Sequence, residues 1–213
     1  LKTPLHAISG YAELLENGMV RPEDVKPFAG KIRAESARMT RLVEDIIDLS
    51  KLDNGGAEMV WEDCDLYRIA ENAVDSLMTT AEAEKVTLNL SGSHATVYGV
   101  PQQLYSIVYN LCDNAIKYHT ADGKVWIRVN QDASGVTLQV QDNGIGIPED
   151  CQDRIFERFY RVDKSRSKAA GGTGLGLSIV KHAVLIHKAY IRVRSKPGVG
   201  TEFTVFFPNS KEK

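Results

Sequence analysis

The sequence predicts an α+β protein: an antiparallel helical hairpin over residues 1–52, then a mixed sheet with helices on one face over residues 58–213. Two patterns carry this prediction. Apolar residues near the N-terminus recur at alternating four- and three-residue steps, and strand-like runs joined by short polar turns alternate with helices afterwards. Residues 53–57 contain Asp-Asn-Gly-Gly, which is typical of a turn, so they form the expected linker.

The hairpin is predicted by one apolar seam on each of its helices. The first helix ends at Asn17 and Gly18, and the second begins near Arg21 and Pro22, where a proline suits the first turn. The seams consist of Leu1, Leu5, Ile8, Ala12 and Leu15, then Val25, Phe28, Ile32, Met39, Leu42, Ile46 and Leu49. Glu35 interrupts the second seam, and both helices therefore present a narrow apolar face.

Two antiparallel helices cannot enclose a core by themselves, and seams this narrow require a partner. We therefore expect the hairpin to be half of a dimeric four-helix bundle, which makes the protein a homodimer. The alternative is a hairpin that packs against the second part of its own chain.

The second part of the chain alternates between strands and helices. Strands are expected at residues 58–62, 86–90, 95–98, 124–130, 136–141, 190–194 and 202–207. Helices are expected at residues 66–83, 102–118 and 175–187. This order predicts an α/β sandwich, in which the helices cover one face of a mixed sheet.

Composition excludes several classes of protein. The 213 residues carry a net charge of -2, which argues against nucleic-acid binding as the main task. No stretch approaches the ~18 apolar residues of a membrane span, so we expect this part of the protein not to be inserted in a membrane. Cys64, Cys112 and Cys151 fit neither a disulfide framework nor a metal-ligand spacing, and Cys112 is expected in the core.

Polar residues in the helix at residues 102–118 indicate metal and phosphate chemistry. Asn110 and Asn114 share one helix face, and Lys117 follows three residues later on that face. Amide oxygens and an ammonium that converge suit Mg²⁺ and phosphate, because Mg²⁺ prefers hard oxygen ligands. The glycine run at residues 171–176 precedes an apolar helix, and such a run lets backbone N–H groups approach an anion.

Four motifs follow one another at residues 110–118, 142–148, 156–161 and 171–180. Together they resemble the N, G1, F and G2 boxes of sensor histidine kinases, whose ATP-binding fold, the GHKL type, is shared with gyrase and MutL. The resemblance covers essentially the whole chain. It implies a GHKL-type sandwich that binds ATP with Mg²⁺. It also implies a kinase that transfers the γ-phosphoryl group to a histidine and then to an aspartate in the receiver domain of a response regulator.

The resemblance assigns roles to residues of the first two motifs. Asn110 would coordinate Mg²⁺, and Asn114 and Lys117 would face the phosphates. Tyr118 would pack near the nucleoside. Asp142 would accept a hydrogen bond from the adenine amine, which selects ATP over GTP.

The other motifs would supply a turn, a lid and the phosphate donors. Gly144 and Gly146 would let the chain turn beside the nucleotide. The ATP lid would span residues 149–170 and be anchored by Phe156 and Phe159, with Arg161 forming either a γ-phosphate contact or an exposed salt bridge. The segment leading into the last helix would bind the phosphates through Gly172, Thr173, Gly174, Leu175 and Gly176.

Asn110 also separates a kinase from an ATPase. In gyrase and MutL this position is a glutamate that activates water, whereas an amide cannot act as a general base. Bound ATP should therefore hydrolyse slowly and wait for another acceptor. Two alternatives stay open: a GHKL-type ATPase and a catalytically silent ATP-binding scaffold.

The first residues resemble the end of the family's phosphoacceptor motif, His-Glu-Leu-Lys-Thr-Pro-Leu. The acceptor histidine would precede Leu1, and His6 lies one heptad too late to replace it. Thr3 matches the position that, in many relatives, orients water for dephosphorylation of the regulator. We therefore expect residues 1–213 to bind ATP without autophosphorylating. We also expect them to be the cytoplasmic domain of a membrane-anchored bacterial protein.

The chain departs from the family's pattern at two places. Val100 and Pro101 replace a common Gly-Asp helix start, and His-Lys-Ala at residues 187–189 replaces a usual His-Gly-Gly turn. Both places lie away from the expected phosphate contacts, so they bear on local structure rather than on nucleotide binding.

Overall fold

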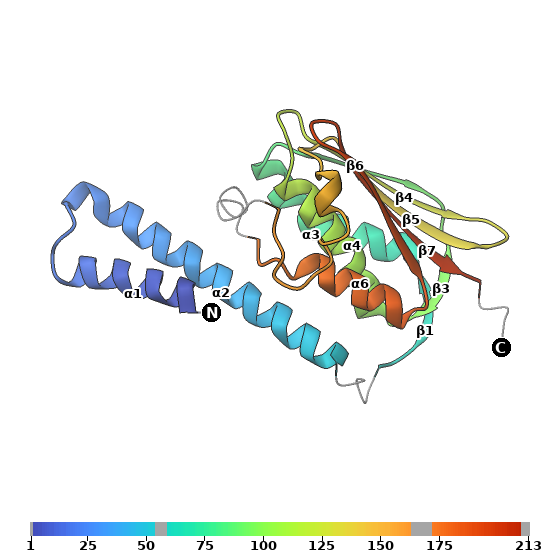
Figure 1. Ribbon diagram of the computed structural model, residues 1–213, viewed down its shortest axis with the longest axis horizontal. Coiled ribbons are helices and arrows are strands. Elements are labelled where there is room, and N and C mark those ends of the chain that lie inside the picture. Colours follow the sequence, from blue (N-terminus) through green and yellow to red (C-terminus); the bar gives the residue numbers. More distant parts are fainter. Residues whose placement is uncertain (1, 54–58, 163–171, 210–213) are drawn as a thin grey trace.

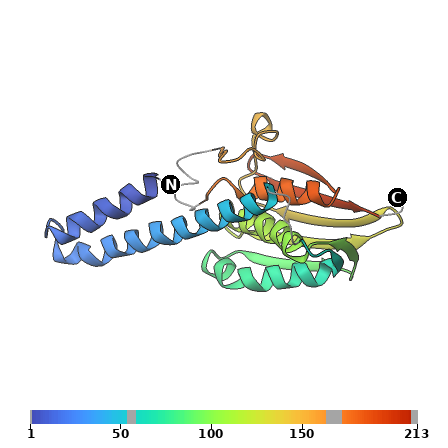
Figure 2. The same cartoon turned by 90° about the horizontal axis from the view of Figure 1, so that it is seen from below.

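The computed structural model describes residues 2–53, 59–162 and 172–209. A long helical hairpin projects from a sandwich of helices and strands (Figure 1). The hairpin consists of α1 (Lys2–Glu16) and α2 (Val25–Asp53), and the turn between them contains the short helix η1 (Pro22–Asp24). Figure 2 shows the same two helices lying side by side, with α2 extending past the start of α1 to reach the sandwich.

The turn of the hairpin follows from its local sequence. Gly18 adopts a φ of +64°, a left-handed conformation that glycine tolerates at a helix end. The helices meet through Tyr11 and Phe28, whose rings form an edge contact with centroids 5.5 Å apart. The ammonium of Lys31 lies 4.9 Å from the centre of the Phe28 ring. These contacts fix the closed end of the hairpin.

The sandwich contains helices that cover one face of a sheet, as predicted (Figure 1). The helices are α3 (Leu66–Ala83), α4 (Pro101–Lys117) and α6 (Gly176–Ile186), with the short helix η2 (Glu149–Cys151) at the start of the segment expected to be the lid. The strands are β1 (Glu62–Asp65), β2 (Thr87–Gly92), β3 (Thr96–Gly99), β4 (Lys124–Gln131), β5 (Gly135–Asp142), β6 (Tyr190–Lys196) and β7 (Gly200–Pro208). The α+β fold class is confirmed.

The main sheet has five strands in the order β2-β4-β5-β7-β6. β2 pairs with β4 in parallel, and the other neighbouring pairs are antiparallel. The register of β5 against β7 places Asp142 opposite Thr201. This pairing brings the end of β5 next to the start of β7, which matters for the site described below.

One predicted strand is wrong. The strand expected at residues 58–62 begins only at Glu62, and the described residues 59–61 belong to no strand. The strand forms at residues 62–65 because these residues pair with β3 in the small second sheet, where Cys64 lies opposite Val97. Asp65 then caps α3 by accepting hydrogen bonds from the backbone N–H groups of Tyr67 and Arg68.

The core lies between the helices and the inner face of the sheet. α4 buries one complete face, made of Leu104, Ile107, Val108, Leu111, Cys112, Ala115 and Ile116. Cys112 is in the core, as predicted, and burial raises the pKa of its thiol to about 12. Alternate residues of β4 and β5 cover the same core, including Val125, Ile127, Val129, Leu138 and Val140. The opposite face of α4 is left to line a cavity.

The hairpin also touches the sandwich. Leu42 and Ile46 of α2 pack against the buried side chains of Leu175 and Ile179, beside Met59. The alternative expectation, a hairpin that packs on its own chain, therefore holds for this half of α2. Among the described residues, neither α1 nor the first half of α2 joins an apolar cluster of the sandwich, and Leu5, Leu14 and Val25 are exposed.

Two further expectations concern membranes and thiols. Within the described ranges, no helix combines the length and apolar character that a membrane span requires. The three cysteines carry no disulfide bond.

Candidate functional site

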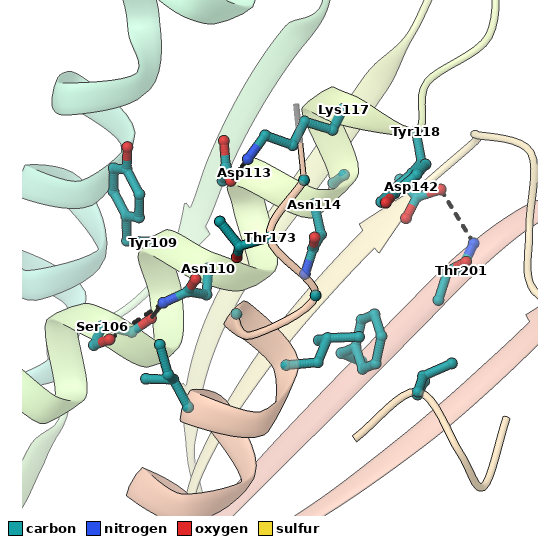
Figure 3. A pocket seen from close by; sticks show the side chains of 18 of the residues that line it. Ser106, Tyr109, Asn110, Asp113, Asn114, Lys117, Tyr118, Asp142, Thr173 and Thr201 are labelled. Atoms are coloured by element: carbon teal, nitrogen blue, oxygen red, sulfur yellow. Dashed lines mark hydrogen bonds and ion pairs between the residues drawn. The ribbon is translucent and has the colours of Figure 1, made fainter. Parts of the chain in front are cut away.

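A cavity of about 850 Å³ opens between α4 and the segment that leads into α6, and its volume lies in the range of small-molecule sites. In Figure 3 its side chains come from α4, from the end of β5 and from the segment before α6. Of the residues predicted to form a site, the cavity is lined by Asn110, Asn114, Lys117, Tyr118, Asp142, Gly146, Arg161, Gly172, Thr173, Gly174 and Gly176. Four motifs that are distant in sequence therefore meet at one place.

Asn110 is held in a defined orientation by its own helix. Its amide Nδ2 donates to the Ser106 carbonyl oxygen at 2.8 Å and to the Ser106 hydroxyl at 3.2 Å. These bonds use the nitrogen side of the amide and leave the oxygen Oδ1 toward α6 (Figure 3). Asn110 thus presents a hard oxygen ligand to the cavity.

Gly176, the first residue of α6, makes room for that oxygen. A Cβ atom at Gly176 would lie 2.6 Å from Asn110 Oδ1, closer than a carbon and an oxygen can approach. Any other residue would therefore push the amide or the helix away. The glycine is explained by the close approach of α6 to α4.

Lys117 lines the cavity and is also paired within its own helix. Its ammonium forms an ion pair with the Asp113 carboxylate one helical turn earlier, and both side chains are mostly buried (Figure 3). Asn114 also lines the cavity, and no hydrogen bond of its side chain is recorded within the described ranges. The lysine therefore lies at the cavity, but its charge is already balanced, and a bound phosphate would have to compete with Asp113.

Asp142 ends β5 with a carboxylate that no cation approaches within the described ranges. Its Oδ1 accepts hydrogen bonds from the backbone N–H groups of Gly144, at 2.8 Å, and Thr201, at 3.2 Å. Burial raises the pKa of the Asp142 carboxyl above its ordinary value, and these N–H groups oppose the shift. The other carboxylate oxygen is available to a hydrogen-bond donor in the cavity.

The turn after Asp142 depends on close backbone contacts. A Cβ atom at Gly144 would lie 2.3 Å from the Tyr118 carbonyl oxygen, so the turn packs directly on the end of α4. Gly146 has a φ of +71°, and a Cβ atom there would lie 2.2 Å from the Lys196 carbonyl oxygen. Gly146 lines the cavity, whereas Gly144 supports it from behind.

The segment before α6 presents the N-terminal end of a helix. No side chain caps α6 at its N-cap residue, Leu175, although the backbone N–H of Leu175 reaches the Thr173 hydroxyl at 3.3 Å. Gly174 adopts a φ of +77°, which directs the chain into the helix. N–H groups that a helix leaves unpaired at its N-terminus attract anions, so this end of the cavity suits phosphate.

Arg161 places a cation beside that helix end. Its Nε and Nη2 atoms are buried and have no hydrogen-bond partner within the described ranges. Burial lowers the pKa of the guanidinium, Arg38 of α2 lowers it further, and Tyr118 opposes both. A buried guanidinium with unpaired donors requires an anion to complete it. The salt bridge considered from the sequence is not formed with any described residue.

Besides Gly144, three predicted site residues do not line the cavity. The Phe159 side chain is exposed, and its backbone N–H donates to the Gly174 carbonyl at 2.8 Å. Leu175 is fully buried against α2 and contributes its backbone. Thr3 belongs to α1, and its side chain lies outside the described part of the chain, as do residues 163–171 of the expected lid.

The cavity combines groups of opposite charge. Arg161 and the N-terminus of α6 suit an anion, and Asp142 offers a carboxylate to a hydrogen-bond donor. No cluster of three or more His, Cys, Asp or Glu side chains occurs among the described residues, so the protein alone does not build a metal cage. Such a site fits a phosphorylated ligand that brings its own oxygen ligands for a cation.

Comparison with known proteins identifies the family to which the chain belongs. Residues 99–211, more than half of the chain, match the family model described as histidine kinase-, DNA gyrase B-, and HSP90-like ATPase. The chain belongs to this family. Residues 1–55 match the His Kinase A (phospho-acceptor) domain, and this combination of domains is that of sensor histidine kinases.

Named relatives agree with this assignment. The chain is 39% identical over 211 residues to the sensor-like histidine kinase SenX3 of Mycolicibacterium smegmatis, which covers 98% of this chain and 54% of the relative. It is 41% identical over 209 residues to the probable sensor histidine kinase TcrY of Mycobacterium tuberculosis, with 98% and 43% covered. The chain spans about half the length of these curated relatives.

Solved structures show the same fold. The histidine kinase AdeS of Acinetobacter baumannii superposes with a TM-score of 0.77 over 99% of this chain and 97% of that chain, at 23% identity. ShkA, solved in full length with AMPPNP, has a TM-score of 0.71 and is 26% identical over 97% of this chain and 44% of that chain. The arrangement of hairpin and sandwich is thus shared by histidine kinases.

Some site residues were missed in the sequence. Asp113 lies four residues before Lys117, a spacing that favours an ion pair on a helix and could have indicated it. Thr201 and Arg38 gave no such signal. Thr201 reaches Asp142 only through the register of β5 and β7, and Arg38 approaches Arg161 only through the packing of α2.

Proposed function

We propose that this chain is the dimerisation and ATP-binding core of a two-component sensor histidine kinase that binds Mg-ATP in the cavity. The observation that carries the proposal is Arg161, whose buried donors have no hydrogen-bond partner among the described residues and suit an anion in the cavity that the N-terminus of α6 also lines. The Asp142 carboxylate supports it, because it suits the adenine amine. The ShkA structure, which contains AMPPNP, supports the same class of ligand.

Different residues of the cavity would bind different parts of the nucleotide. Asp142 would accept the adenine amine, with Tyr118 beside the nucleoside. Asn110 would hold Mg²⁺ through Oδ1, and Asn114 would face the phosphates with the glycine segment at residues 172–176. Bound Mg²⁺ would supply charge neutralisation at the phosphates. Lys117 would reach the phosphates by exchanging its Asp113 partner for a phosphate oxygen.

Asn110 favours a kinase over an ATPase. Its amide is fixed by Ser106 and cannot accept a proton from water, so the nucleotide is held without a base for hydrolysis. In the whole protein the γ-phosphoryl group would pass to a histidine and then to an aspartate of a response regulator receiver domain. A GHKL-type ATPase and a silent ATP-binding scaffold are the remaining candidates. Neither of them would transfer a labelled phosphoryl group to a histidine.

We propose that the hairpin makes a homodimer and that it meets the response regulator. The matched phospho-acceptor domain and the uncovered apolar face of the hairpin support the dimer. ThkA, a histidine kinase of similar fold, was solved in complex with the response regulator TrrA, with a TM-score of 0.76 and 20% identity. Thr3 would orient water for dephosphorylation of the regulator. The whole protein would be membrane-anchored, with these residues in the cytoplasm.

Binding of a labelled ATP analogue tests the site. We expect a dissociation constant in the micromolar to millimolar range, about that of nucleotide enzymes, and a loss of at least roughly tenfold in Asn110→Ala and in Asp142→Ala. Asn130→Ala and Asp75→Ala serve as controls, because both residues are exposed and lie outside the cavity. Unchanged binding in both site variants would remove the assignment.

A second experiment tests the phosphoryl acceptor. Residues 1–213 incubated with radiolabelled ATP should show no acid-labile, base-stable label, because His6 is not at the acceptor position. Adding the family's His-Glu upstream of Leu1 should create a label that survives His6→Gln. A label on residues 1–213 that His6→Gln removes would instead make His6 the acceptor.

A further inference from the structure

His187 ends α6 at the end of the helix opposite to the glycine segment. Its half-buried ring lies among residues from three other places in the sandwich. The ring centroid is 5.1 Å from that of Trp61, which follows the linker, and 6.2 Å from that of Phe207 in β7. A Cβ atom at Gly99 would lie 2.7 Å from the ring, so the glycine allows the close approach. His187 thus fills a site that the fold has shaped for it.

Two backbone groups fix the protonation of this ring. Nδ1 lies 2.7 Å from the Ala183 carbonyl oxygen, which can only accept, so Nδ1 carries a proton. Nε2 accepts a hydrogen bond from the backbone N–H of Val100 at 3.0 Å, so Nε2 carries none. The arrangement is satisfied only by the neutral imidazole, in a single tautomer.

The bond to Val100 joins the two helices that line the cavity. Val100 is the N-cap residue of α4, and its own side chain makes no capping hydrogen bond. Instead, the His187 side chain of α6 accepts a hydrogen bond from the backbone N–H at this helix end. At the other end of α6, its first residue Gly176 lies against Asn110, in the middle of α4, with no room for a Cβ atom. Both ends of α6 are therefore matched to α4, and a slide of one helix along the other would change the position of Asn110.

We propose that His187 is a positioning residue for the nucleotide site, and that its neutral form holds α4 and α6 in the register that places Asn110. This inference rests on the proposed nucleotide site for its second readout, but not for its first. Protonation of Nε2 would turn the acceptor into a donor that faces the Val100 N–H. The helix pair would then lose its link at the end remote from the nucleotide.

The direction of the pH effect follows from burial. Burial lowers the pKa of His187, the Ala183 carbonyl opposes the shift, and no charged side chain contributes. The titratable groups around this cluster are the Cys64 thiol, which bonds to the Gly99 carbonyl, the Tyr98 phenol, whose ring centroid lies 5.7 Å from that of Trp61, and the charged side chains of Glu62, opposite Gly99, and Lys188, the next residue. The native state therefore binds this proton less readily than the unfolded chain, and stability falls as pH drops below about 6.5, the unfolded value.

The experiment compares wild type with His187→Gln, whose amide oxygen can accept from Val100 at every pH. His182→Gln is the matched control, because His182 lies on the same helix and makes no recorded hydrogen bond in the described ranges. Stability by urea unfolding and affinity for an ATP analogue are each measured from pH 7.5 to 5.5. Protonation of the nucleotide affects all three proteins equally, so it cancels when the affinity of a variant is divided by that of wild type.

We expect acidification to weaken wild type and His182→Gln relative to His187→Gln, in both readouts, by roughly two- to tenfold, the effect of one hydrogen bond on an equilibrium. Identical pH profiles in all three proteins would overturn the proposal. A difference in stability without one in affinity would keep the link between the helices and remove the positioning role. If wild type binds no nucleotide at any pH, the proposed function fails and the stability profile still tests the link.

A measurement on wild type alone covers the case in which His187→Gln does not fold. Nitrogen–proton correlation spectra of the imidazoles should show His187 with its proton on Nδ1 and with a pKa below the ordinary value of about 6.5. A His187 ring protonated on Nε2, or a pKa at or above that value, would contradict the proposal.

Discussion

Leu138 in β5 is fully buried, whereas Leu5 in α1 is 49% exposed, although both belong to regular apolar patterns. The contrast extends to the two regions as wholes. The sandwich encloses its apolar residues within one chain, whereas every described leucine, isoleucine, valine, methionine or aromatic side chain of α1 and α2 is at least partly exposed. The sandwich can therefore be stable alone, and the hairpin needs a second copy to bury its seams.

The same contrast separates the two halves of the proposed function. The described residues that line the cavity all belong to the sandwich, and α2 supports it from outside through Leu42 and Ile46 against Ile179 and through Arg38 near Arg161. Nucleotide binding should therefore survive the loss of the dimer. Both tryptophans of the chain, Trp61 and Trp126, lie outside the hairpin, so their fluorescence reports on the sandwich by itself.

The largest effect is expected in the core of the sandwich. Leu138→Ala should lower the free energy of unfolding by about 2–5 kcal/mol, because it leaves a cavity among fully buried side chains. Leu5→Ala is the matched change in the hairpin and should alter the tryptophan-reported transition by less than about 0.5 kcal/mol. Equal losses in urea unfolding would show that the two regions share one core.

A charge in the hairpin seam should break the dimer and spare the sandwich. Ile32→Asp removes an apolar contact worth about 1.5–3 kcal/mol in the bundle, which corresponds to a shift from dimer to monomer in sedimentation. The ATP-analogue affinity and the tryptophan-reported unfolding should stay close to wild type. The comparison fails if Ile32→Asp remains a dimer, or if it unfolds the sandwich.

Loss of the unpaired guanidinium should act on the nucleotide alone. Arg161→Met should weaken ATP-analogue binding by about 1.5–3 kcal/mol, the range for a hydrogen bond to a charged group. Arg192→Met, on the exposed side of β6 and outside the cavity, should leave the affinity unchanged. Equal changes of affinity in Arg161→Met and Arg192→Met would show that Arg161 does not bind the nucleotide.

The smallest effect concerns the turn after α6, where the chain departs from the family. The backbone N–H groups of Lys188 and Ala189 bond to Leu185 and Val184, and Lys188 adopts a φ of +51° in a position that favours glycine. Lys188→Gly should therefore stabilise the sandwich by about 0.5–1 kcal/mol. Lys181→Gly, inside the same helix, should destabilise it by about 1 kcal/mol. A loss of stability in both variants would refute the strain at Lys188.

Local patterns predicted what depends on local structure. Helix spacing was sufficient to place Asn110 and Asn114 on the cavity face of α4, and alternation was sufficient to find the strands of the main sheet. Alternation was not sufficient for β1. Met59 and Trp61 alternate like strand residues, but the pairing of this segment with β3 starts only at Glu62.

Contacts between distant elements could not be predicted. The hydrogen bond from Thr201 to Asp142 depends on the register of two strands, and the bond from Val100 to His187 depends on how α4 and α6 pack. Neither leaves a mark in local sequence. Lys117 and Asp113 have the spacing of a helical ion pair. Lys117 was assigned to the phosphates, and its pairing with Asp113 was not predicted.

The central claim is that the cavity binds Mg-ATP with the base at Asp142 and the phosphates at Arg161. The most direct test is a crystal structure of residues 1–213 with AMPPNP and Mn²⁺, whose anomalous signal locates the metal. The account predicts the metal signal beside Asn110 Oδ1, the adenine amine within hydrogen-bond distance of Asp142, and phosphate oxygens against the Arg161 donors. A nucleotide bound in the reverse direction, or metal and nucleotide bound outside this cavity, would contradict it.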